Sequence, residues 1–538
     1  MSVLPSLLPH WFKELSLVAQ IPIALFGTLA LAVVLNVINQ LVLPKDPTRP
    51  PVVFNYIPWF GSAAYYGEDP YKFFFECREK YGDVFTFNLM GRKITVALGP
   101  KGNNLSLGGK VSQVSAEDAY THLTTPVFGK GVVYDCPNEM LMQQKKFIKH
   151  GLTTEALQSY AALIYAETEH FFEHELKFSP TSPGPKKFEL LKIMSELTIL
   201  TASRTLQGKE VRNSLSHDFA RLYEDLDGGF TPLNFMFPNL PLPSYRRRDA
   251  AQKKMSDFYM EIIQKRKAGE TDHEFDMISA LTGSKYKNGV PLTDRDISHM
   301  MIALLMAGQH TSSATSSWTL LHLAHRPDIY EELYKEQKAK FGNADGTFRP
   351  LTYEESKELP LMDSVIRETL RMHAPIHSIM RKVISDIAVP PSLSSPAGEG
   401  AAYVIPKGNF ILASPGVSQM DPRIWADSNE WNPHRWSEDN GAAADSRVAY
   451  GDKGEQVDYG FGAVSKGTES PYQPFGAGRH RCVGEQFAYL QLTTIFSYIV
   501  RGYTMKLEGK EVPKPNYRTM IVLPLHGYAS FTKRTEQV

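Results

Sequence analysis

Apolar and polar positions divide the chain into a short apolar beginning and a long remainder with mostly helical periodicity. No residue between Glu14 and Lys45 is charged, and about 20 mostly apolar residues are enough to cross a bilayer. This pattern predicts a membrane anchor at residues 1–43, with the spanning helix at about 16–43. A buried core helix is the alternative interpretation, but the position at the end of the chain favours the anchor.

A proline-rich segment follows the anchor. Residues 44–61 contain five prolines, which predict a stiff, extended linker that orients the next domain relative to the membrane. Residues 62–538 contain no second apolar span, no internal repeat and no low-complexity tract, and we interpret them as one domain outside the bilayer.

The domain is expected to be mainly helical with small β sheets. Helical periodicity dominates from about 150 to 380, and alternating runs mark the strands. The expected elements are a helix at 69–82, a hairpin at 83–99, a long helix at 293–327, a shorter helix at 363–375, two short strands at 403–414, a polar, glycine-rich loop at 445–470, a last helix after Cys482, and a closing strand pair at 517–534. An apolar break at 230–245 is either a packed loop or the wall of an apolar cavity.

Composition narrows the function classes only slightly. Lys and Arg total 58 and Asp and Glu total 58, so no overall charge points to a nucleic-acid partner. The three cysteines, Cys77, Cys136 and Cys482, are an odd number and far apart, which fits a reducing compartment better than a disulfide framework. No CxxC pair or HExxH motif indicates zinc.

Two helices carry candidate chemistry. At about 1.5 Å per residue the helix at 293–327 is roughly 50 Å long and must cross the middle of the domain, with Thr293 as its N-cap. Hydroxyls in its central "AGQHTSS" can bond back to backbone carbonyls and kink the helix, but a small-residue packing contact is the favoured interpretation of this stretch alone. In the helix at 363–375, Glu368 and Arg371 share a face, which by itself indicates only a surface ion pair.

The strongest chemical signal is "PFGAGRHRCVGEQFAYL" (474–490). Neighbouring cations and the start of a helix lower the pKa of a thiol, so the segment predicts a thiolate at Cys482. Glycines let the loop approach a flat ligand, and Phe475 can shield the sulfur from water. A thiolate that binds haem iron as an axial ligand requires these features. A catalytic cysteine nucleophile, the rival interpretation, needs a base and an open approach, and neither is obvious.

Three stretches together carry a resemblance to a known family. "FGAGRHRCVG", "ETLR" and "AGQHTSS" resemble the signatures of the cytochrome P450 superfamily, and the resemblance covers the chain from the anchor onward. It implies a cytochrome P450 fold, with Cys482 as the ligand of the iron of haem b. It also implies that Glu368 and Arg371 form a buried structural triad with Arg435 rather than a surface pair.

Departures from the general pattern narrow the resemblance. His310 stands where most P450s have an acid, and His480 stands where most have an arginine. With segments 119–137 and 374–383, these residues are similar to the sterol 14α-demethylases, in particular those of filamentous fungi.

The resemblance implies a site residue by residue. The haem-binding positions are Cys482, Tyr120, Tyr134, Lys145, Arg381, His480, Phe475 and Gly476. The positions of the sterol cavity are Tyr120, Leu123, Thr124, Phe128, Phe230, Pro232, Phe235, His310, Thr311, Ile376, Ser378 and Met520. Cations and hydroxyls suit buried haem propionates, and a largely apolar cavity suits a fused-ring substrate.

The resemblance also implies a reaction. The 14α-methyl group of lanosterol or 24-methylenedihydrolanosterol (eburicol) is removed as formate in three oxidations, as a step of ergosterol biosynthesis. Each oxidation consumes O2 and two electrons from NADPH, delivered by NADPH–cytochrome P450 reductase. Azole inhibitors are expected to bind, and the domain is expected on the cytosolic side of the endoplasmic reticulum membrane. A P450 monooxygenase of another lipid, or a non-enzymatic haem or sterol carrier, are the alternatives.

Proton delivery is assigned as a hypothesis. Thr311 is the expected local hydrogen-bond partner, and His310, paired with Asp227, is proposed to replace the usual acid, because an imidazole ordinarily has a pKa near 6.5. The alternative is that His310 packs or bonds the sterol hydroxyl network. A basic run at 244–254 could meet the reductase or anionic lipid, but a solvated helix surface is favoured.

Overall fold

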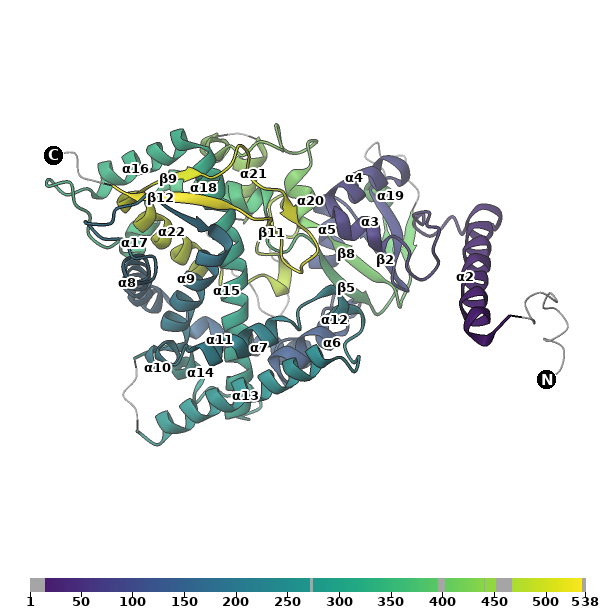
Figure 1. Cartoon of the computed structure of the whole chain (residues 1–538). Coiled ribbons are helices and arrows are strands. Elements are labelled where there is room, and N and C mark those ends of the chain that lie inside the picture. The colour runs from purple at the N-terminus through teal and green to yellow at the C-terminus, as the bar shows by residue number, and fades with distance from the viewer. Residues whose placement is uncertain (1–14, 271–273, 395–401, 440, 451–466, 535–538) are drawn as a thin grey trace.

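The chain folds into a mainly helical body with small sheets, as predicted, and one apolar helix stands apart from that body (Figure 1). The computed structural model describes residues 15–270, 274–394, 402–439, 441–450 and 467–534. The sheet-rich part of the body lies nearest the separate helix, and α15 runs through the middle of the helical part.

The separate helix is α2 (Leu17–Val42), at the position of the predicted span. The stretch Val18–Val42 is long and apolar enough to cross a membrane, and none of its residues is buried. Several hydrogen bonds fix the segment after it to the body, and two of them join it to different strands. The Val53 N–H donates to the Thr86 carbonyl at 2.8 Å, and the Val404 N–H donates to the Thr48 carbonyl at 2.7 Å.

Strands form one larger sheet and several small ones. The five-stranded sheet has the order β1-β2-β8-β5-β3, and β4-β12-β9 form a three-stranded sheet, while β10-β11 and β6-β7 are pairs. The predicted hairpin is β1 and β2, with Val84 opposite Ala97. The strands are β1 (Val84–Leu89), β2 (Arg92–Ala97), β3 (Val114–Ser115), β4 (Lys186–Glu189), β5 (Ile379–Val383), β6 (Ile387–Val389), β7 (Tyr403–Ile405), β8 (Phe410–Ala413), β9 (Tyr503–Leu507), β10 (Pro515–Asn516), β11 (Leu523–Pro524) and β12 (Tyr528–Lys533).

Helices make up most of the body. They are α3 (Ala63–Glu68), α4 (Pro70–Tyr81), α5 (Pro100–Leu107), α6 (Glu117–Phe128), α7 (Asn138–His150), α8 (Thr154–His170), α9 (Leu190–Ala202), α10 (Lys209–Asn213), α11 (His217–Asp227), α12 (Pro232–Met236), α13 (Pro243–Lys267), α14 (Met277–Leu281), α15 (Asp294–His325), α16 (Pro327–Phe341), α17 (Tyr353–Ser356), α18 (Pro360–Met372), α19 (Pro391–Ser394), α20 (Pro415–Met420), α21 (Gly441–Tyr450) and α22 (Glu485–Gly502).

Helix α15 organises this core. Thr293 and Asp296 form a capping box at its start, which satisfies two backbone donors that the first turn would otherwise leave unpaired. The helix is uninterrupted to His325 and packs on α9, α13, α18 and α22. Thr311 Oγ1 donates to the Ala307 carbonyl at 2.8 Å, as the sequence predicts for hydroxyls in "AGQHTSS".

Two sequence predictions are wrong. The start of the expected loop at 445–470 is helical, because α21 extends to Tyr450. The run of alanines in α21 favours a helix. Residues 451–466 lie outside the described part. The expected strand pair at 517–534 is not a pair. β11 bonds to β10, the strand directly before it, whereas β12 bonds to β4 and β9, which come from earlier in the chain.

Candidate functional site

The loop before α22 presents Cys482. The Cys482 N–H donates to the Phe475 carbonyl at 2.9 Å, which closes the loop, and the Gly484 N–H points at the sulfur. Gly478 has a φ of +66°, and a Cβ there would lie 2.2 Å from the Leu107 carbonyl oxygen, so only glycine fits. The Cys482 side chain remains accessible at the end of this tight turn.

The neighbouring cations do not produce a thiolate by themselves. Although the side chain reaches solvent, the protein around the sulfur desolvates it, and this raises the pKa of the Cys482 thiol. The Gly484 N–H, Lys145 and Arg481 oppose that rise, but they do not outweigh it. The sequence expectation of a cation-lowered pKa is therefore wrong for the protein alone. Coordination to a metal ion deprotonates a thiol outright, so an iron ligand remains consistent with this environment.

The three basic residues around Cys482 have different surroundings. Arg481 forms an ion pair with Glu485 at 2.9 Å. Burial and the nearby Arg381, Lys145 and Arg479 hold the pKa of His480 well below its usual value, so His480 is neutral at pH 7. Burial and Arg381 also lower the pKa of Arg479. The Arg479 Nε atom is buried and makes no hydrogen bond to any described residue.

The structure brings the predicted propionate contacts together. Tyr120 and Tyr134 stack with ring centroids 5.4 Å apart, and Tyr134 lies 6.1 Å from the His480 ring. Arg381 acts electrostatically on both tyrosines. Lys145 Nζ donates to the Arg479 and Arg481 carbonyls at 2.9 and 2.7 Å, and burial lowers its pKa to about 8.

This cationic cluster has little compensating negative charge. Among the described residues, no carboxylate forms an ion pair with Arg381 or Arg479, and the bond that Arg381 makes is to the Met380 carbonyl. Buried cations are unfavourable without a partner. Carboxylates of a bound group would provide one, and an accessible thiol lies beside the cluster. The residues therefore fit haem, with its propionates at the cluster and its iron at Cys482.

One face of α15 is accessible in the middle of the core. Ala307 is exposed, and Leu304, Gly308 and Thr311 are half-buried, whereas most other residues of the helix are buried. Positions 304, 307, 308 and 311 share one face of a helix. This stripe has mostly small side chains and carries the Thr311 hydroxyl, so it suits the approach of a flat group and a small reactant.

His310 and Asp227 lie together, although they are far apart in the sequence. His310 Nε2 is 3.0 Å from Asp227 Oδ1, and the Asp227 side chain is 47% exposed. Tyr223 Oη lies 3.1 Å from the same nitrogen and donates to Gln309 Oε1 at 3.0 Å. The pair connects the centre of α15 with the surface at the end of α11.

Helix α6 and the segment after α11 form one aromatic wall. Leu123 and Thr124 are buried on α6. Phe128 lies 5.3 Å from Phe230, and Phe235 of α12 lies 6.2 Å from Tyr120. The break at 230–245 thus packs as a loop with a short helix that starts at Pro232, and its aromatic residues contact the predicted cavity residues of α6.

The remaining predicted cavity residues come from two loops. Ile376 is exposed, and Ser378 bonds to His377 at 2.7 Å. Met520 is half-buried between β10 and β11. The Val522 N–H donates to the Pro375 carbonyl at 3.0 Å, so the two loops touch. The Met380 N–H donates to Tyr120 Oη at 2.8 Å, which ties the first loop to α6.

The expected triad is buried and fully bonded. Arg371 Nε and Arg435 Nε donate to the two oxygens of Glu368, both at 2.9 Å. Trp436 Nε1 also donates to Glu368 at 3.0 Å. Sequence reasoning missed Trp436, although it is the residue next to Arg435.

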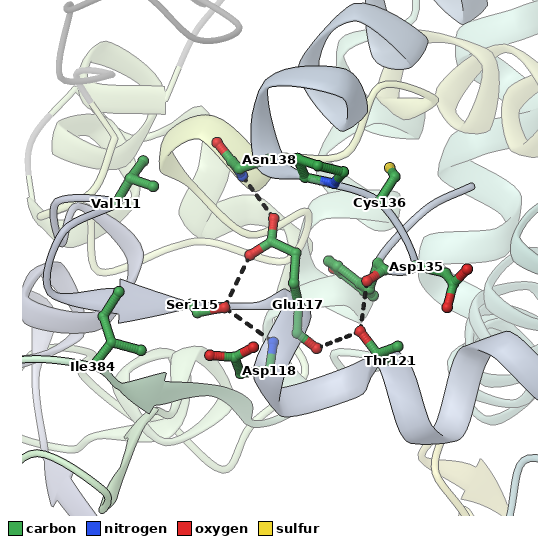
Figure 2. Close-up of a pocket in the computed structure, with 11 residues that line it drawn as sticks. Val111, Ser115, Glu117, Asp118, Thr121, Asp135, Cys136, Asn138 and Ile384 are labelled. Atoms are coloured by element: carbon green, nitrogen blue, oxygen red, sulfur yellow. Dashed lines mark hydrogen bonds between the residues drawn. The ribbon is translucent and has the colours of Figure 1, made fainter. Parts of the chain in front are cut away.

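A separate pocket lies beside the start of α6 (Figure 2). Its volume is about 490 Å³, and its lining includes Tyr134 and three acids. Glu117 accepts hydrogen bonds from Ser115 at 3.1 Å and from Asn138 at 2.9 Å. The rest of the lining is one amide, two hydroxyl residues and several apolar residues, and the pocket shares Tyr134 with the predicted propionate contacts.

Comparison with known proteins gives consistent matches. The family model described as Cytochrome P450 matches residues 44–529. The lanosterol 14-alpha demethylase of Mycosarcoma maydis is 56% identical, covering 96% of this chain and 92% of that protein. The eburicol 14-alpha-demethylase of Uncinula necator is 50% identical, covering 93% of each. The structure of retinoic acid bound cyanobacterial CYP120A1 matches with a TM-score of 0.71 at 19% identity, covering 91% of this chain and 100% of that chain, which shows a shared fold.

Proposed function

The chain belongs to the cytochrome P450 family, and we propose that it is a sterol 14α-demethylase anchored in a membrane by α2. The observation that carries the proposal is the accessible Cys482 beside the buried Arg381 and the half-buried Arg479, neither of which forms an ion pair with a carboxylate among the described residues. Identities of 48–56% with fungal lanosterol and eburicol demethylases supply the choice of substrate.

Each group of residues has a proposed part in binding. Cys482 would hold the haem iron, with Phe475, Gly476 and the Gly484 N–H around the sulfur. Tyr120, Tyr134, Lys145, Arg381 and His480 would hold the propionates. Bound haem with a thiolate ligand supplies the activation of O2. The aromatic wall of α6 and α12 and the two loops would enclose the sterol, with apolar contacts along the rings.

The proposed reaction is three oxidations of the 14α-methyl group of lanosterol or eburicol, with release of formate. Each uses O2 and two electrons from NADPH, which a flavoprotein reductase supplies. Thr311, on the accessible stripe of α15, would hydrogen-bond to the reacting oxygen. We place the domain on the cytosolic side of the endoplasmic reticulum membrane, where azoles would compete for the iron.

Two measurements test this function. Reduction under carbon monoxide is expected to give the red-shifted Soret band of thiolate-ligated haem. Incubation of the full chain with reductase, NADPH and lanosterol or eburicol is expected to release formate and the 14-demethylated diene. A Soret band without sterol turnover, together with oxidation of another lipid, would assign the chain to a different P450 reaction. Absence of the band would reject haem–thiolate binding.

His310, paired with Asp227, is proposed to supply protons to the reaction. We expect His310→Ala to lower turnover by about a hundredfold, because general acid–base catalysis typically contributes at least that much. Asp227→Ala should have a smaller effect of the same kind, because Asp227 acts through His310. In both variants more electrons should leave as peroxide, measured per NADPH. His325→Ala, an exposed histidine on the same helix, is the control. Unchanged coupling of electrons to product in both variants would reject the assignment.

A further inference from the structure

The hydrogen bonds around His310 contain more information than the pairing with Asp227. One ring nitrogen, Nε2, lies 3.0 Å from Asp227 Oδ1 and 3.1 Å from Tyr223 Oη. The Tyr223 ring also packs against the imidazole, with centroids 5.7 Å apart. Tyr223 comes from α11, four residues before Asp227, so one helix supplies both contacts.

The direction of the Tyr223 hydrogen bond follows from its other partner. Tyr223 has one hydroxyl hydrogen, and Gln309 Oε1, at 3.0 Å, can only accept it. The amide of Gln309 is oriented by its own Nε2, which donates to the Ser195 carbonyl at 3.4 Å. The Tyr223 oxygen is therefore left as an acceptor towards His310. Tyr223 and Gln309 are 7% and 5% exposed, so water does not compete easily for these bonds.

Both neighbours of Nε2 thus accept hydrogen bonds. A carboxylate has no hydrogen to give, and the Tyr223 hydrogen is already committed to Gln309. Burial, with a smaller contribution from Asp227, raises the pKa of the Tyr223 phenol well above its usual value, so the hydroxyl stays protonated. The hydrogen between these groups must belong to His310. Nε2 carries it whether the imidazole is neutral or charged.

We propose that Tyr223 and Gln309 are positioning residues that hold His310 as the Nε2–H tautomer, so that its Nδ1 gains and loses the catalytic proton. The hydrogen at Nε2 stays in place between Tyr223 and Asp227. Asp227 then acts as a partner that orients and stabilises the protonated ring, and protons do not pass through it. This inference rests on the proposed function and assigns the atom at which His310 works.

A purely structural role for Tyr223 is the competing explanation, and the chain offers a matched control. Tyr259 of α13 is also buried and donates to the side-chain oxygen of a glutamine, Gln207, at 2.9 Å. No hydrogen bond between Tyr259 and His310 exists among the described residues. Tyr223→Phe and Tyr259→Phe therefore remove the same kind of hydrogen bond, but only the first changes the contacts of His310.

The decisive measurement is the tautomer itself. We would label the full-length holoprotein with 15N-histidine and record the ring nitrogens in the diamagnetic ferrous carbon monoxide form, with His310→Ala to identify the resonance. We expect a protonated Nε2 and an unprotonated Nδ1 in the neutral ring. Tyr223→Phe/Asp227→Ala, which removes both acceptors of the Nε2 hydrogen, should give a mixture of tautomers. Gln309→Leu frees the Tyr223 hydrogen to donate to Nε2 and should favour Nδ1–H. Tyr259→Phe should change nothing.

The coupling of electrons to product, measured as peroxide formed per NADPH, gives a second readout. We expect Tyr223→Phe and Gln309→Leu to raise peroxide per NADPH by about two- to fivefold, as for the loss of one neutral hydrogen bond, with Tyr259→Phe unchanged. An Nδ1–H tautomer in the unaltered protein would overturn the proposal. So would a pure Nε2–H tautomer in Tyr223→Phe/Asp227→Ala, or an equal yield of peroxide per NADPH in Tyr223→Phe and Tyr259→Phe. A failure of the proposed function is distinguishable, because the unaltered protein would then release no formate from either sterol.

Discussion

Buried charges in this protein are balanced in two different ways. Glu368 is fully buried, and Arg371, Arg435 and Trp436 satisfy both of its oxygens. Arg479, by contrast, has a buried Nε without a partner among the described residues. A satisfied network fixes a structure, whereas an unsatisfied buried cation is a binding site for an anion. We therefore expect the first set to stabilise the fold and the second to bind an anionic group of a ligand.

The satisfied network predicts a large loss of stability when its anion is removed. Glu368→Gln leaves Arg371 and Arg435 without a compensating charge in the core, so we expect the free energy of unfolding to fall by about 3–5 kcal/mol. Denaturant unfolding measures it. Asp363 on the same helix pairs with Arg367, and the Asp363 side chain is 43% exposed. Asp363→Asn should therefore cost less than about 1 kcal/mol. Equal losses would show that the triad has no special role.

The unsatisfied cation predicts a loss of cofactor retention. Arg479→Leu should speed the loss of haem to an acceptor protein by about tenfold or more, since a hydrogen bond to a charged group is worth about 1.5–3 kcal/mol. The rate of Soret decay measures it. Arg518→Leu, at an exposed arginine, is the control. If Arg479→Leu retains haem as well as the control, the cluster does not hold the propionates.

The sequence predicts single residues well where the chemistry is local. The Cys482 segment and the shared face of Glu368 and Arg371 could be identified from spacing alone. The pKa of the Cys482 thiol could not, because burial outweighs the cations and depends on the whole fold. For the same reason nothing in the sequence shows that Arg479 lacks a partner, or that Tyr223 reaches His310.

At the scale of elements, prediction succeeded where the periodicity and the end signals agree. Helix α15 has Thr293 as its cap, as predicted, and the β1–β2 hairpin turns at Gly91. The failures are of another kind. β11 and β12 look like partners in the sequence, but β11 pairs with β10 just before it. β12 pairs with the distant β4 and with β9, and such strand pairing follows packing more than local preference.

Helices α15 and α18 meet at a buried histidine pair. His322 Nε2 and His373 Nε2 are 2.8 Å apart, and each ring stacks on a tryptophan. Burial lowers the pKa of His322 to about 3 and the pKa of His373 well below its usual value. The folded protein therefore keeps both rings uncharged at pH values where the unfolded chain, with pKa values near 6.5, binds two protons.

This difference predicts stability that falls with acidity. The unfolded state binds more protons below about pH 6.5, so the free energy of unfolding should decrease as the pH falls from about 6.5 towards the folded pKa values. The pair should contribute about 2.7 kcal/mol per pH unit well inside that window. Urea unfolding at pH 7, 6 and 5 measures the slope. His373→Gln should reduce it by about half of that amount, and His526→Gln, at an exposed histidine, should not change it. An unchanged slope in His373→Gln would contradict the assignment.

At the scale of the whole molecule, the anchor and the body are joined by more than a connector. Asn36 and Gln40, one turn apart on α2, donate to the Asn55 carbonyl at 2.8 and 2.7 Å, and the Asn55 N–H donates back to Gln40. Asn55 lies in the segment that is fixed to β1. We call these three residues the clasp. They connect the anchor to the five-stranded sheet.

The clasp also indicates how far α2 enters a membrane. Residues 17–35 precede it, and at about 1.5 Å per residue they span about 28 Å, close to the thickness of the hydrocarbon core. Polar side chains are costly inside that core. The clasp then lies at the membrane surface, where the exposed Tyr56 and Trp59 also suit the interface.

A rigid joint predicts a fixed angle between anchor and body. In Asn36→Leu/Gln40→Leu the helix keeps its apolar length but loses its bonds to Asn55, so α2 should swing on the segment before Thr48. Spin labels on Leu25 and on Lys338 of α16, with the full chain in lipid nanodiscs, should give a clearly broader distance distribution in this variant. Thr28→Val removes a polar group that bonds only within α2, to the Ala24 carbonyl, and should leave the distribution narrow. If the clasp variant is as narrow as Thr28→Val, the bonds to Asn55 do not set the orientation, and the contacts of Thr48 and Val53 must hold it alone.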